Sequence, residues 1–200
     1  MPRLIDVDAR NAEIAAASLR VLERDGLAGL SVRRVAEEAG IATASLRRAF
    51  PTQHALREHC LALVEERATA RIRALPPDLT GRRLVEAMLA QLLPLDRERR
   101  TELAAQIQLG VLALTDPALR AAAVRLDAAV GRACRAAVAI LADAGQLGRD
   151  RDPDYEAQRL HALLDGAAVH GLWAGEATQA AHALDLVSRH LAELADEASG

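Results

Sequence analysis

The feature that most constrains this chain is the stretch SVRRVAEEAGIATASLRRAF, residues 31–50, which holds two short helical patterns separated by one glycine. In the first pattern apolar residues recur at three- and four-residue steps behind Ser31, a residue type that commonly caps helices. Gly40 ends that pattern, and a second one runs from about Thr43 to Phe50. The stretch therefore predicts two short helices joined by a tight turn.

The rest of the chain also shows helical periodicity. A first helix is expected to end at Gly26, a long helix to run from Thr52, as its cap, to Arg73, and five more to follow at 80–93, 96–114, 117–143, 153–173 and 177–196. The Asp-Pro pairs at 116–117 and 152–153 place a capping acid before a proline at the first helical position. Alternating apolar segments are missing and aromatic residues make up only 2%, so the predicted fold class is all-α.

Composition describes a soluble chain. The 200 residues are 51% apolar without a membrane-length apolar run, and acids stand where a signal peptide needs basic residues. We therefore expect a cytoplasmic protein with no membrane partner. Cys60 and Cys134 are far apart in apolar surroundings, which favours reduced core thiols over a disulfide or a metal framework.

Charge is unevenly distributed along the chain. The net charge is −3, but residues 31–57 contain five arginines and two glutamates, a local charge of +3 that leaves −6 for the remainder. One end of the protein could thus face phosphate.

Two short helices around a glycine form a helix-turn-helix, in which the second helix enters the major groove of DNA. Leu46, Phe50 and Ala49 are expected to point to the core. The outward face of the second helix should then comprise Thr43, Ala44, Arg47 and Arg48. Hydroxyl and guanidinium groups can contact base edges and phosphates, although solvated arginines on two ordinary helices would give the same pattern.

The segment IAAASLRVLERDGLAGLSVRRVAEEAGIATASLRRAFPTQHAL, Ile14 to Leu56, resembles the amino-terminal signature of the TetR family of bacterial transcriptional regulators. The resemblance implies a three-helix DNA-binding domain over 1–51 and a larger helical domain for ligand binding and dimerisation over 52–200. It also implies a ligand-responsive repressor that binds a near-palindromic operator as a dimer.

Individual positions can be matched to that signature. The resemblance implies that Ser31 caps the second helix and meets phosphate, with Arg33 in the first turn. It places Thr43, Ala44, Ser45, Arg47 and Arg48 on the recognition helix. Gln53 stands where many members have a phosphate-binding lysine, while Ala42 replaces a serine cap. Arg47 with Gln53 is similar to the BetI-like branch, whose ligand-binding domain the later segments also resemble, and Ala49 departs from that branch.

In this family the last two helices pair with their twins to form a dimer. The sequence permits this because each helix has an apolar face, and glycines at 166 and 171 allow close backbone approach. The expected interface residues are Leu160, Leu163, Leu164, Gly166, Ala167, Leu184, Val187, Leu191 and Leu194. Packing of both faces within one chain is the alternative.

The segment LAAQIQLGVLAL, 103–114, is apolar nearly all round and is expected to be central, beside a cavity for a small, mainly apolar ligand. The candidate lining residues are Gln106, Gln108, Leu109, Leu112, Leu126, Val130, Cys134, His161 and Trp173. An amide satisfied by backbone or water is the other interpretation of each glutamine.

Enzymatic motifs are missing. No histidine has a glutamate three residues earlier, as a di-iron bundle needs, and there is no zinc-protease, nucleophile-elbow or phosphate-loop motif. His161 and Asp165 share a helix face, where a structural contact is expected. We therefore expect no catalytic residues, no cofactor and no metal. The main alternative is a helical interaction module that has lost DNA recognition, which Ala42, Ala49 and Gln53 suggest. A helical enzyme that binds a small molecule is a less favoured alternative.

Overall fold

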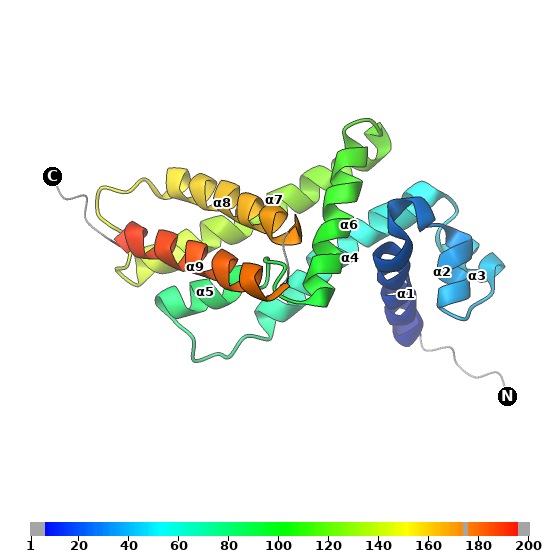
Figure 1. The fold of residues 1–200 in the computed structure, drawn as a ribbon, viewed down its shortest axis with the longest axis horizontal. Helices are drawn as coiled ribbons and strands as arrows, with labels where there is room; N and C mark the ends of the chain where they lie inside the picture. Colours follow the sequence, from blue (N-terminus) through cyan, green and yellow to red (C-terminus); the bar gives the residue numbers. More distant parts are fainter. Residues whose placement is uncertain (1–6, 174–175, 196–200) are drawn as a thin grey trace. The chain divides into compact units, whose positions relative to one another are not determined.

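A computed structural model describes residues 7–173 and 176–195, and this part of the chain folds entirely into helices, turns and loops. Nine helices are found there (Figure 1). In chain order they are α1 (Val7–Gly29), α2 (Val32–Glu38), α3 (Thr43–Ala49), α4 (Gln53–Arg73), α5 (Gly81–Ala90), α6 (Arg97–Ala113), α7 (Pro117–Asp143), α8 (Pro153–Trp173) and α9 (Glu176–Ala195). The all-α prediction is confirmed, and residue 196, the predicted end of the last helix, lies outside the described residues.

The helices form two compact units. The first contains the residues up to Val64 together with Thr101–Val124, and the second contains Glu65–Arg100 together with the residues from Arg125 on. Helices α4, α6 and α7 each contribute residues to both units. The division at residues 51 and 52 drawn from the sequence stays a prediction.

Local capping explains where several helices begin. The Asp116 carboxylate accepts a hydrogen bond from the Ala118 amide at 3.1 Å, and the Asp152 carboxylate accepts one from Asp154 at 3.0 Å. These bonds satisfy amide groups that have no partner inside the helix. Both predicted Asp-Pro starts are therefore confirmed, with α7 and α8 beginning at the prolines.

The regular path of the first helix ends at Gly26, as predicted, although the span of α1 continues to Gly29. Gly26 takes a left-handed conformation, with φ 63°, and one further helical turn follows as far as Gly29. Glycine has no Cβ, so it can take a positive φ and interrupt a helix at little steric cost. Gly26 thus ends the first regular helix, and the short helical turn as far as Gly29 is separated from it by this kink.

The first unit has its core between α1, α2, α3 and the start of α4. The fully buried side chains that join these helices are Val21, Leu30, Val35, Leu46 and Leu56. In the second unit α9 packs against α8 and also contacts α5. Both predicted core thiols are confirmed, since Cys60 and Cys134 are free and fully buried. None of the helices in the described part is long and apolar enough to cross a membrane.

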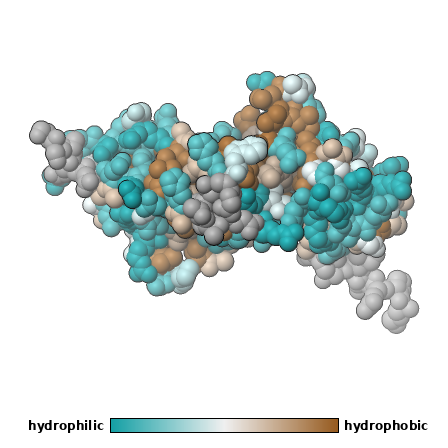
Figure 2. Space-filling model, in the orientation of Figure 1, coloured by the Kyte–Doolittle hydropathy of each residue, from teal (hydrophilic) through white to brown (hydrophobic). Residues whose placement is uncertain are grey.

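The segment 103–114, most of which lies in α6, was predicted to be central, and its residues differ in how far they are buried. Leu103 and Leu109 are buried, but Val111 and Leu114 are 62% and 79% exposed. Figure 2 shows an apolar patch over the end of α6 and the start of α7, where Val111, Leu114 and Val124 are the exposed large apolar residues. From 101 to 113 every residue except Val111 is buried or half-buried, so α6 is covered over most of its surface there and is exposed toward its carboxyl end.

Two further side chains expected to point inward do not. Ala49 is exposed at the end of α3, and Trp173 is 83% exposed at the end of α8. Phe50 is half-buried and its ring contacts the ring of His59, with the centroids 4.8 Å apart. The large aromatic at position 173 is therefore not a core filler within the chain.

Candidate nucleic-acid interface

Helices α2 and α3 form the helix-turn-helix that the sequence predicts. The Ser31 hydroxyl accepts a hydrogen bond from the Arg34 amide at 3.3 Å, so it caps α2 as expected. The chain then turns at Gly40, whose φ of 64° is left-handed, and the Ile41 amide donates to the Ala36 carbonyl at 3.0 Å. This closure is typical of a helix end with a left-handed glycine and sets the direction in which α3 starts.

Helix α3 is amphipathic in the way that a recognition helix requires. Leu46 is fully buried and fixes the rotation of the helix about its axis. The residues on the outer side line one shallow surface depression: Thr43, Ala44, Arg47 and Arg48. The four residues predicted for the outward face therefore do lie together.

The guanidinium groups of Arg47 and Arg48 are exposed and have no carboxylate partner in the described part of the chain. Three arginines of α1 and α2 are paired with acids: Arg24 and Arg34 bond Asp25, while Arg33 bonds Glu37. Unpaired arginines on a protruding helix are available to an external anion. The local charge balance thus concentrates the available positive charge on α3.

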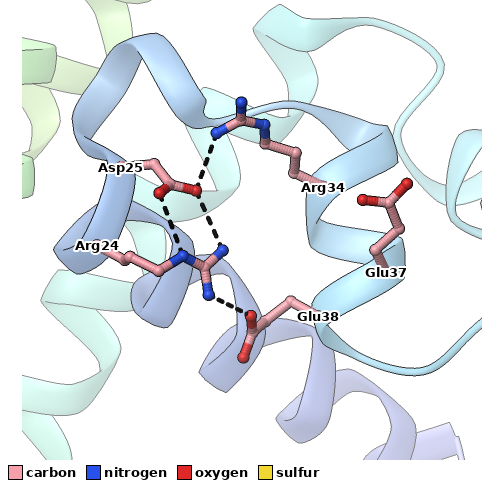
Figure 3. Close-up of a pocket in the computed structure, with 5 residues that line it drawn as sticks. All are labelled: Arg24, Asp25, Arg34, Glu37 and Glu38. Atoms are coloured by element: carbon pink, nitrogen blue, oxygen red, sulfur yellow. Dashed lines mark hydrogen bonds and ion pairs between the residues drawn. The ribbon is translucent and has the colours of Figure 1, made fainter.

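An ion-pair network joins α1 to α2 on another part of this unit, as Figure 3 shows. Arg24 forks onto the Asp25 carboxylate, with both N···O distances 3.1 Å, and its third nitrogen lies 2.7 Å from Glu38. Arg34 contacts Asp25 at 3.0 Å, and Arg20 contacts Glu38 at 2.7 Å. The network fixes the position of α2 relative to α1, and it includes no side chain of α3.

These contacts shift the pKa values of the two acids. The hydrogen bond from Arg24 holds the pKa of the Asp25 carboxyl below its usual range. Hydrogen bonds from Arg24 and then Arg20 do the same for the pKa of Glu38. Both carboxylates therefore stay charged, and their neighbours stay paired, well into mildly acidic solution.

Three other residues predicted to contact DNA have internal partners. Ser45 accepts a hydrogen bond from the Arg10 guanidinium of α1, which ties the recognition helix to α1. The Gln53 amide nitrogen donates to the Leu30 carbonyl at 2.9 Å, which joins the start of α4 to the residue before the α2 cap. Arg33 points into solvent but is bonded to Glu37 at 2.9 Å. Whether these residues also meet DNA stays a prediction.

Sequence reasoning missed several of these positions. Arg10 and Arg24 belong to α1, which was considered only for its apolar face, and no spacing rule links them to Ser45 or Glu38. Ala42 was noted as a departure from a serine cap, and α3 indeed starts without a side-chain cap. The recognition helix is therefore secured by tertiary contacts instead of its own first residue.

The residues predicted to line a ligand cavity divide between the two units. Gln106, Gln108, Leu109 and Leu112 belong to the first unit. Leu109 is fully buried there, and Gln106 and Leu112 are half-buried. The Gln108 side-chain oxygen accepts a hydrogen bond from the Leu27 amide at 2.8 Å, just after the break at Gly26. The side-chain oxygen of Gln108 is therefore satisfied by a backbone amide, which is the second interpretation that the sequence allowed for this glutamine.

The remaining cavity candidates lie in the second unit. Cys134 is fully buried, Leu126 is 6% exposed, and Val130 and His161 are half-buried. Burial raises the pKa of the Cys134 thiol to about 12, with the charge of Asp165 acting in the same direction. The thiol therefore stays protonated. The ligand role of all these residues, and of the exposed Trp173, stays a prediction.

The residues predicted for a dimer interface are mostly enclosed within the chain. Packing of α8 against α9 buries Leu160, Leu164, Ala167, Val187, Leu191 and Leu194. Leu163 is half-buried, Leu184 is 40% exposed and Gly166 is exposed. The inner faces of the two helices thus pack against each other, and their outer faces are the ones that remain accessible.

Two family models match the chain. The model described as bacterial regulatory proteins of the tetR family matches residues 14–60, which include the helix-turn-helix. The model described as the C-terminal domain of BetI-type transcriptional repressors matches residues 81–196. Together these matches cover both parts that the sequence resemblance implied.

Individual relatives agree with the family models. The HTH-type transcriptional regulator PksA of Bacillus subtilis is 32% identical over 176 residues, covering 86% of this chain and 83% of PksA. A TetR transcription regulator from Haloarcula marismortui shares the fold, with a TM-score of 0.79 at 22% identity over 94% of this chain and 98% of that one. The multidrug binding protein EbrR, solved with ethidium, gives a TM-score of 0.61 at 27% identity over 90% and 97% of the two chains.

Proposed function

Because this chain belongs to the TetR family of transcriptional regulators and has a BetI-type C-terminal domain, we propose that it is a ligand-responsive repressor that binds a near-palindromic operator as a dimer. The family consists of DNA-binding regulators and not of enzymes. The observation that carries the proposal is the outer face of α3, where Arg47 and Arg48 have no carboxylate partner among the described residues.

Each residue of the proposed interface has a distinct task. Thr43, Arg47 and Arg48 lie in or beside the major groove, where hydroxyl and guanidinium groups can contact base edges or phosphates. Ser31, Arg33 and Gln53 contact phosphate and so set the position of the helix without reading sequence. Gln53 can do this while bonded to Leu30, because its amide nitrogen carries a second N–H.

The test is a binding assay, titrated with salt, on the DNA that flanks the protein's own gene. We expect saturable, sequence-dependent binding whose logarithm falls linearly with the logarithm of salt concentration. The Arg47→Ala/Arg48→Ala double variant should lose this binding, whereas Arg83→Ala, at an exposed arginine of α5, should retain it. Binding that is independent of sequence, or equal in both variants, would favour the interaction module without DNA recognition.

Dimerisation follows from what a helix-turn-helix needs. Two recognition helices about 34 Å apart can occupy successive turns of one DNA face, whereas a single short helix gains little affinity. The accessible face of α8 offers a surface for this pairing, with side chains recurring at helical steps: Tyr155, Ala162, Gly166, Val169 and Trp173. The small residues in the middle allow two helices to approach closely, and Leu184 of α9 is also exposed.

The ligand is proposed to act through α4, which contains residues of both compact units. A ligand that shifts this helix changes the separation of the two recognition helices in the dimer, and so the fit to both half-sites. We propose a small, mainly apolar ligand. The structure of EbrR with ethidium, an aromatic cation with a large apolar surface, supports apolar contacts to the ligand. A tenfold loss of operator affinity requires about 1.4 kcal/mol of coupling between the two sites.

Reciprocity provides the test of this switch. Compounds that do not themselves bind DNA are first selected by a rise in melting temperature, and their affinity is then measured with and without operator DNA. Coupling requires that operator weakens ligand binding by the same factor by which the ligand weakens operator binding. Compounds that bind but leave operator affinity unchanged would indicate a DNA-binding dimer that no such ligand controls.

A further inference from the structure

Three side chains with metal-ligating atoms converge between α7 and α8, within the second compact unit. They are Asp127 of α7 and His161 and Asp165 of α8, and their ligand atoms all lie within 4.8 Å of one another. The His161 Nε2 atom is 3.7 Å from the Asp127 carboxylate and 3.6 Å from that of Asp165. His161 and Asp165 are one turn apart on α8, and the packing of α7 brings Asp127 to this pair.

The central nitrogen of this cluster has no hydrogen-bond partner. His161 Nε2 is buried and makes no hydrogen bond, because both carboxylates lie beyond hydrogen-bond distance. An unsatisfied buried polar atom costs free energy, so a structure that holds one between two acids calls for an explanation. A cation between the three groups would satisfy the nitrogen and both carboxylates together.

The distances from His161 Nε2 to the two carboxylates fit two ligands of one transition-metal ion better than they fit a hydrogen bond. Two ligands about 2.1 Å from a tetrahedral ion lie roughly 3.4 Å from each other, close to the two distances measured here. The four-residue step from His161 to Asp165 places both side chains on one face of α8. Both carboxylates are exposed, so rotation about their side-chain bonds is the movement that binding of an ion requires.

The surroundings leave the site accessible and its ligands available. The side chains of Asp127 and Asp165 are 73% and 59% exposed, so an ion can enter from solvent. Gly131 faces the imidazole, and a Cβ there would lie 3.5 Å from His161 Nδ1. Arg135 also lies close to Gly131, yet it forms no ion pair with either carboxylate in the described part of the chain.

We propose that Asp127, His161 and Asp165 bind a first-row divalent cation, with Zn²⁺ as the best match, and leave at least one coordination position open. One imidazole with two carboxylates suits Zn²⁺ and similar ions more than Ca²⁺ or Mg²⁺, which prefer oxygen ligands only. The buried Cys134 thiol is not part of the ligand set. This proposal does not depend on the DNA-binding function.

The test is calorimetric titration of the full-length, untagged and chelator-treated protein with ZnCl₂, and optical titration with CoCl₂. We expect one ion per chain and a cobalt spectrum without a thiolate charge-transfer band. The variants Asp127→Asn, His161→Gln and Asp165→Asn should each weaken binding by roughly tenfold or more, since even changes outside the ligand shell have effects of that size. His170→Gln, at an exposed histidine of the same helix, is the matched control and should bind as the wild type does.

Two outcomes would overturn the proposal. The first is the absence of saturable binding to the wild type, which would leave the three side chains as a structural contact between α7 and α8. The second is equal binding by wild type and His161→Gln, which would place any bound ion elsewhere. Because Asp127 is mostly exposed, Asp127→Asn is expected to keep the fold, and circular dichroism of each variant confirms that lost binding is not lost structure.

Discussion

At the scale of single residues, pairing separates the arginines of the helix-turn-helix into two groups. Arg33 and Arg34 are bonded to acids, while Arg47 and Arg48 are not. A paired arginine can contact phosphate only by sharing or releasing its acid, so its contribution to binding is smaller than that of an unpaired one. Glu37, the partner of Arg33, thus modulates the charge that α2 presents.

This pairing predicts opposite effects for its two members. Arg33→Ala should weaken binding to all DNA sequences alike and reduce the slope of the logarithmic salt dependence by about one. Glu37→Gln should strengthen binding to all sequences, because it releases Arg33 from an ion pair of 2.9 Å. Salt titrations of both variants on operator and on unrelated DNA measure these effects. A weaker binding by Glu37→Gln would contradict the role given to Arg33.

Sequence preference should depend on α3 instead. Replacing Thr43 and Arg48 together should change which bases are preferred, because their side chains line the outer depression of the recognition helix. Selection from random DNA compares the preferred sequences of the wild type and the double variant. Identical preferences would remove both residues from base contact.

The acids of the α1–α2 network predict an acid-dependent loss of stability. The folded-state pKa values of Asp25 and Glu38 are lowered, so their stabilising contribution is present above the unfolded pKa and is lost as pH falls through the folded one. Glu38→Gln should therefore unfold more easily near neutral pH, and its stability should fall less steeply below about pH 4.5. Urea unfolding at several pH values tests this.

The control for this experiment is Glu193→Gln, at an exposed glutamate of α9. It should show the same pH dependence as the wild type. Added salt should reduce the difference between wild type and Glu38→Gln, because exposed ion pairs are screened. A Glu38→Gln protein with the wild-type pH profile would show that the network contributes nothing measurable.

At the scale of elements, α3 lacks a cap that most such helices have. Ala42 already has the extended backbone of an N-cap residue, with φ −64° and ψ 128°, but it has no side-chain acceptor. Ala42→Ser should therefore stabilise the protein by about 1 kcal/mol, because the new hydroxyl can accept a hydrogen bond from an unpaired amide of the first turn. Urea unfolding measures the change, and Ala49→Ser, at the exposed last residue of α3, is the control. A destabilised Ala42→Ser protein would show that this cap does not form.

At the scale of the whole molecule, the proposed dimer depends on the outer face of α8. Gly166 is exposed, and an added Cβ would meet nothing within 4 Å in the single chain. Gly166→Arg should thus fold normally as a monomer but place an unpaired charge at a close helix contact between two chains. Sedimentation should show monomers or aggregates of this variant, whereas Ala142→Arg, at an exposed alanine of α7, should remain dimeric. A soluble Gly166→Arg dimer would exclude this face.

Much of the fold follows from local signals in the sequence. The bounds of α7 and α8 match the prediction because an aspartate and a proline act within the first turn of the same helix. The outer face of α3 was predictable because one apolar residue, Leu46, fixes the rotation of a seven-residue helix. Such signals involve residues at most four positions apart, so they do not depend on how the chain folds back on itself.

The tertiary structure alone decided which helical faces meet. The apolar faces of α8 and α9 could pack within one chain or across a dimer, and the structure buries them against each other. The partner of Gln108 is the Leu27 amide, and the neighbours of His161 are acids of two helices. These contacts depend on the axial rotation and relative position of packed helices. Those quantities come from burying apolar surface across the whole unit, and no spacing within a single helix encodes them.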